Sequence, residues 1–85
     1  MTRLTAPACR AARALLGWSM RDLKDKAGVA LATVQAIEAG GDFRASTGDK
    51  IVDAFAAHGV DILNGDAPGA RMKPGWPSPV GTTET

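Results

Sequence analysis

The side chains best suited to chemical contacts in this chain are hydroxyl, amide and cationic groups in its middle part. Ser19, Thr33 and Gln35 can donate and accept hydrogen bonds, and Arg21 and Arg44 carry positive charge. Groups of these kinds bind phosphate oxygens and the edges of nucleic acid bases. These residue types permit such contacts only where the fold brings them to one surface.

Residues typical of enzyme active sites are sparse. His58 is the only histidine, and it directly precedes Gly59, where a positive charge suits the end of a helix. Cys9 is the only cysteine, so it cannot form an internal disulfide, and we expect it to pack as a small apolar side chain. We expect neither enzymatic activity nor a metal, another cofactor or a small-molecule ligand.

Two short helices joined by a tight turn must position the polar side chains. Ser19 is a good N-cap for a helix over about 20–27, and Gly40 follows a second helix over about 30–39. The inward face of this pair is supplied by Leu23, Ala27, Val34 and Ile37. Two helices joined in this way form a helix-turn-helix, the motif that places its second helix in the major groove of DNA.

Two further helices are predicted on either side of this motif. The first covers about 5–16, with Thr5 as its N-cap and Gly17 at its end, and Trp18 after it should pack into the core. The other is expected to be capped by Ser46 or Thr47 and to end at Gly59, with Ile51 and Phe55 facing inward.

The last third of the chain has a different character. Residues 60–63 alternate apolar and polar side chains, and a turn-rich segment separates them from a weak strand over 70–73. We expect a small hairpin here, with 64–73 as turn and second strand, and a flexible tail over 74–85. The fold class is therefore all-α, a compact four- to five-helix domain over 1–63 with a small C-terminal β-hairpin.

Size and charge narrow the function classes. The 85 residues fit one domain, and ten Lys and Arg against nine Asp and Glu give a net charge of +1. DNA-binding domains are usually more basic, so we expect a monomer to bind weakly. The sequence has no apolar run long enough to cross a membrane and no signal-peptide pattern, so we expect a cytoplasmic protein with no membrane partner.

The spacing of the motif residues resembles the Cro/phage-repressor-like helix-turn-helix family, also called XRE, over about residues 6–63. The residues that carry the resemblance are Arg13, Gly17, Ser19, Leu23, Ala27, Gly28 and Val29, followed by Thr33, Val34, Ile37, Glu38 and Gly40. The resemblance implies four or five helices, of which the second crosses the phosphate backbone and the third enters the major groove. It also implies a homodimer that binds operator DNA and regulates transcription.

The resemblance also implies roles for single residues. The family pairs an arginine at the Arg13 position with a glutamate at the Glu38 position, which links the first helix to the end of the third. Ser19 would cap the second helix and bring its N-terminus near a phosphate. The predicted DNA-contacting residues are Ser19, Met20, Arg21, Ala30, Leu31, Ala32, Thr33, Gln35, Ala36, Arg44 and Ser46.

The predicted recognition helix departs from the family pattern. Met20 stands where glutamine is common, and alanine or leucine occupies four positions where the family usually offers polar side chains: Ala30, Leu31, Ala32 and Ala36. None of these side chains can make the bidentate hydrogen bonds that distinguish base pairs. Only Thr33 and Gln35 remain for that purpose.

Three explanations for this apolar helix stay open. The protein could read thymine methyl groups and the shape of DNA. It could instead rely on dimerisation and on phosphate contacts. The side chains that would make the phosphate contacts are Arg21, Lys24, Arg44 and Lys50. Alternatively, the apolar surface could bind a protein, so that the chain is an interaction module on a helix-turn-helix scaffold. We predict a sequence-specific, dimeric repressor that binds an inverted repeat, with the interaction module as the alternative.

Overall fold

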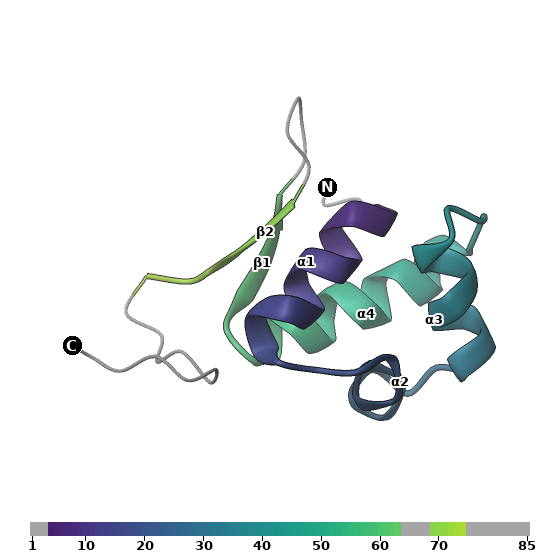
Figure 1. Cartoon of the computed structure of the whole chain (residues 1–85), viewed down its shortest axis with the longest axis horizontal. Coiled ribbons are helices and arrows are strands. Elements are labelled where there is room, and N and C mark those ends of the chain that lie inside the picture. The colour runs from purple at the N-terminus through teal and green to yellow at the C-terminus, as the bar shows by residue number, and fades with distance from the viewer. Residues whose placement is uncertain (1–3, 64–68, 75–85) are drawn as a thin grey trace.

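The computed structural model describes residues 4–63 and 69–74, which form four helices and one two-stranded sheet. The elements in chain order are α1 (Ala6–Leu16), α2 (Met20–Ala27), α3 (Leu31–Glu38), α4 (Ala45–Ala57), β1 (Val60–Leu63) and β2 (Gly69–Met72). Figure 1 shows α1 and α4 in the middle of the molecule, with the strands on one side and α3 on the other. All four helices were predicted from the sequence. Because the structure also contains a two-stranded sheet, the fold is not purely all-α.

The boundaries of α1 and α2 are set by local capping, as the sequence predicts. The Thr5 hydroxyl accepts a hydrogen bond from the Ala8 backbone N–H at 3.2 Å, and Gly17 ends α1 with φ of 68°. At α2, Ser19 and Asp22 form a reciprocal capping box, with bonds of 3.0 and 2.9 Å. These bonds occupy backbone N–H groups that would otherwise lack a partner at each helix start.

The start of α4 differs from the prediction. Arg44 is the N-cap, no side chain caps the helix, and the Gly48 backbone N–H already donates to the Arg44 carbonyl at 3.1 Å. The prediction that Ser46 or Thr47 caps α4 is therefore wrong. The physical reason is packing: Phe43 lies so close to Gly48 that a Cβ there would be 2.8 Å from the Phe43 ring, and this contact turns the chain into the helix early.

The hairpin docks on the helices through one apolar face. Its strands are antiparallel, and Val60 pairs with Met72 and Ile62 with Ala70. These four side chains lie on the face that meets α1 and α4, and Val60 and Ile62 are buried there. The hairpin prediction is confirmed, although β2 begins and ends one residue earlier than expected. Residues 64–68 of the predicted turn and 75–85 of the predicted tail lie outside the described residues.

The core lies between α1, α4, the motif helices and the hairpin. Its largest fully buried side chains are Phe55, Leu23, Ile37, Ile51, Val34, Val60 and Cys9. Trp18, in the link before α2, is half-buried and stacks on Phe55 with ring centroids 5.7 Å apart. No helix in the part of the chain that the structure describes is long and apolar enough to span a membrane.

Candidate nucleic-acid interface

The turn between α2 and α3 sets the angle of the motif. Gly28 has φ of 70°, and its backbone N–H and that of Val29 both donate to the Lys24 carbonyl, at 2.9 and 3.2 Å. A Cβ on Gly28 would meet nothing within 4 Å, so the positive φ and not the space explains the glycine. Leu23 on α2 and Val34 on α3 are fully buried behind the turn. These two side chains pack both helices against the core.

The outward side of α3 carries small side chains and one amide. Ala32, Gln35, Ala36 and Ala39 are all exposed, and their spacing of three and four residues places them on one side of the helix. We call these four residues the α3 face. Gln35 is the member of the α3 face that can hydrogen-bond to a base edge, since the other three present only methyl groups.

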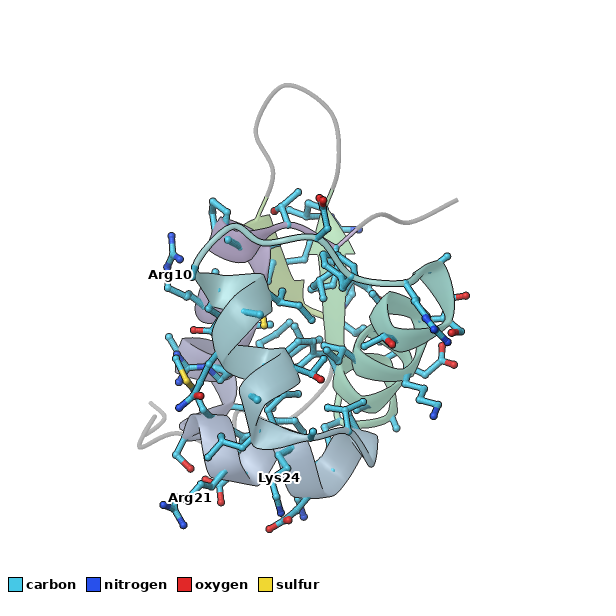
Figure 2. The ribbon with its side chains drawn as sticks, turned by 90° about the vertical axis from the view of Figure 1, so that its right-hand side faces the viewer. Arg10, Arg21 and Lys24 are labelled. Carbon is cyan, nitrogen blue, oxygen red and sulfur yellow. The ribbon has the colours of Figure 1, made fainter. Side chains whose placement is uncertain are left out.

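Cationic side chains surround the α3 face. Figure 2 looks onto α3 and shows Arg10 and Arg21 at one margin, near opposite ends of the helix, with Lys24 at the lower edge. Lys24 is also paired with Asp25 at 2.8 Å, and this hydrogen bond lowers the pKa of the Asp25 carboxyl. An exposed ion pair of this kind is weak, so Lys24 can leave Asp25 for another anionic partner. Arg10, Arg21 and Lys24 thus border the uncharged α3 face, and the Asp25 carboxylate accompanies Lys24.

Arg44 lies on the α4 side of the α3 face. A shallow groove of about 350 Å³ runs there, lined by Ala32, Thr33, Ala36, Asp42, Phe43, Arg44 and Thr47. Four predicted contact residues therefore meet at one place: Ala32, Thr33, Ala36 and Arg44. Asp42 adds a carboxylate to the same groove, which opposes an anionic ligand.

The other predicted contact residues are placed less uniformly. Ser19, Arg21 and Ala30 are exposed around α2 and the start of α3, whereas Leu31 and Met20 are half-buried. Met20 packs against the core, so only part of it can belong to an outer surface. Ser46 is exposed on α4 but does not line the groove beside α3.

Arg13 and Glu38 form the ion pair that the resemblance implies. The Arg13 Nε and Nη2 groups each donate to one carboxylate oxygen of Glu38 at 2.6 Å, and Nη1 donates to the Trp18 carbonyl at 3.1 Å. The Glu38 side chain is 3% exposed and that of Arg13 is 19% exposed. A bidentate pair with this degree of burial links α1 to the last residue of α3.

The surroundings of Glu38 keep it ionised. Burial raises the pKa of its carboxyl. Hydrogen bonds from Arg13 and Cys9, together with the charges of Arg13 and Arg10, lower this pKa by more than burial raises it, so the net shift is downward. The Cys9 thiol donates to Glu38 Oε2 at 3.3 Å, and burial together with the Glu38 charge raises the pKa of this thiol to about 12. Cys9 is therefore a protonated hydrogen-bond donor within the core.

Arg10 makes a contact that was not predicted from the sequence. Its Nη1 group donates to the Glu38 backbone carbonyl at 2.7 Å, so α1 holds the end of α3 at two points. The available signal was the spacing of Arg10 and Arg13, which lie three residues apart and hence on one side of α1.

Comparison with protein families identifies the motif. A family model described as helix-turn-helix matches residues 10–63. A search of curated proteins found no match to the chain. Within the described residues, no group of three or more His, Cys, Asp or Glu side chains is arranged to hold a metal ion. The matched region contains α2, α3 and most of α1, so the chain belongs to the XRE-type helix-turn-helix family of DNA-binding regulatory domains.

Proposed function

We propose that this chain is a sequence-specific repressor that places α3 in the major groove and binds an inverted repeat as a homodimer. The observation that carries the proposal is the exposed α3 face, which lies between cations on two margins. Figure 2 shows Arg21 at one margin of α3. Arg44 lines the groove on the α4 side, beside Ala32 and Ala36. A helix in the major groove lies between two phosphate backbones, so positive charge is useful on both of its sides.

The small side chains of α3 favour A·T base pairs. In the major groove, thymine presents a methyl group that packs against apolar side chains such as alanine, and adenine offers a donor and an acceptor that suit glutamine. Gln35, between Ala32 and Ala36, has this chemistry. A G·C pair would leave its polar edge facing methyl groups, and unpaired polar groups are costly to desolvate.

Dimerisation compensates for the few base contacts that one subunit can make. The net charge of +1 and a single amide on the α3 face predict weak binding by one copy. Two linked copies raise the local concentration of the second α3 once the first is bound. Occupation of the site then excludes other proteins from that DNA, which is why we propose repression.

Selection of duplexes from a random library tests the proposal. We expect enrichment, first at low salt and then near physiological ionic strength, of an inverted repeat with A·T-rich half-sites about 10 base pairs apart. Absence of enrichment, or binding that is indifferent to salt, would contradict DNA recognition. That result would favour a protein partner for the apolar side chains of α3.

Arg44 and Asp42 provide a matched pair of variants, because they lie in the same groove with opposite charges. Arg44→Ala should weaken all duplexes alike and reduce the slope of log K against log salt by about 0.9, the value for one lost phosphate contact. Asp42→Asn should strengthen binding about twofold, since a charge ~10 Å from a phosphate in water costs roughly 0.4 kcal/mol. Titrations at several salt concentrations measure both effects. An Arg44→Ala effect confined to one base position would contradict its phosphate contact.

A further inference from the structure

The C-terminal end of α3 receives a cation from another helix. α3 has no basic residue in its last turn, where the helix dipole favours positive charge. Arg10 on α1 supplies that charge through its 2.7 Å bond to the Glu38 carbonyl. The bond uses one of the five N–H donors of the guanidinium, which leaves others for an external acceptor.

The position of Arg10 relative to α3 points to that acceptor. Arg10 is exposed, and Figure 2 shows it on the same side of α3 as Arg21, near the opposite end of the helix. Arg44 lies on the other side, in the groove beside Ala32 and Ala36. A major groove is bordered by two sugar–phosphate backbones. Arg10 and Arg21 would face one of these backbones, and Arg44 would face the other.

We infer that Arg10 binds a phosphate of the backbone that runs along this margin, and that it couples this contact to the position of α3. The inference rests on the proposed DNA binding and extends the contact surface from the motif onto α1. Because one guanidinium holds both the Glu38 carbonyl and the phosphate, the backbone contact sets the register of α3 in the groove. Arg10 is thus a positioning residue for base recognition by Gln35.

The test compares Arg10→Gln with Arg10→Lys in the whole chain, with Arg71→Gln as the matched control. Arg71 is exposed on β2, and Figure 1 shows the hairpin on the far side of the molecule from α3. Binding to the best selected duplex and to an unrelated duplex is titrated between about 50 and 200 mM salt. We expect Arg10→Gln to reduce the salt slope by about 0.9 on both duplexes, and Arg71→Gln to leave it unchanged.

Arg10→Lys separates the two roles of the guanidinium. The lysine keeps a point charge but lacks the planar fork, so we expect it to restore most of the salt slope while the preference for the selected duplex falls about threefold to tenfold. An unchanged slope in Arg10→Gln, with only lower thermal stability, would mean that Arg10 merely caps α3 and would overturn the inference. Absence of salt-dependent duplex binding by the unsubstituted chain would instead refute the proposed function, and the Arg10 inference with it.

Discussion

Replacement of Arg13 by methionine is expected to lower the free energy of unfolding by about 3–5 kcal/mol. The substitution removes the bidentate partner of Glu38 and leaves a carboxylate that is only 3% exposed without its main counter-charge. Arg10 and Cys9 still contact Glu38, but one does so at the backbone and the other through a weak thiol donor. Urea unfolding followed by circular dichroism measures the loss.

A double variant controls for simple loss of packing. Arg13→Met combined with Glu38→Leu removes both charges, and replacement of a buried ion pair by apolar side chains is often neutral for stability. We therefore expect the double variant to unfold at a urea concentration much closer to that of the original chain. A double variant no more stable than Arg13→Met alone would show that the charge left on Glu38 is not the cause.

The same pair makes stability depend on pH in a defined direction. The folded chain lowers the pKa of Glu38 below its ordinary value of 4.5, because hydrogen bonds and nearby positive charges outweigh the effect of burial. Stability from the ionised carboxylate is therefore present above about pH 4.5 and is lost as pH falls through the folded pKa. The stability difference between the original chain and Glu38→Gln should be constant near neutral pH and shrink below about pH 4.5.

Phe55→Ala is expected to have a second effect of similar size, about 3–5 kcal/mol, through a cavity in the centre of the core. The Phe55 side chain is fully buried on α4 and stacks with Trp18 at 5.7 Å, so the substitution also removes an aromatic contact. An 85-residue domain has roughly 4–13 kcal/mol of stability in total. The variant should thus lose a large part of the total stability, and it should be close to unfolded if that total lies near the lower end of the range.

Ile51→Val is the matched control for this cavity. It lies on the same helix and is equally buried, but it loses a single methylene and should cost about 0.5–1.5 kcal/mol. The two variants are compared by urea unfolding under identical conditions. A Phe55→Ala loss no larger than that of Ile51→Val would mean that the core collapses around the cavity and that the Trp18 stacking contributes little.

Elements whose signals are local could be predicted from the amino-acid sequence. Ser19 and Gly28 mark the ends of α2 because an N-cap hydroxyl and a positive φ act within a few residues of the helix they bound. The spacing of the motif residues predicted the family, which the family comparison confirms. The alanine-rich character of the α3 face was also readable, since helical periodicity alone places Ala32, Gln35 and Ala36 on one side.

Other features depend on contacts between residues far apart in the chain, so local sequence patterns could not predict them. The early start of α4 comes from the packing of Phe43 on Gly48, and local capping preferences pointed instead to Ser46 or Thr47. The role of Arg10 exists because α1 crosses the end of α3, 28 residues further along the chain. Periodicity shows which side of a helix is polar, but the packing of the helices decides which cations stand beside α3.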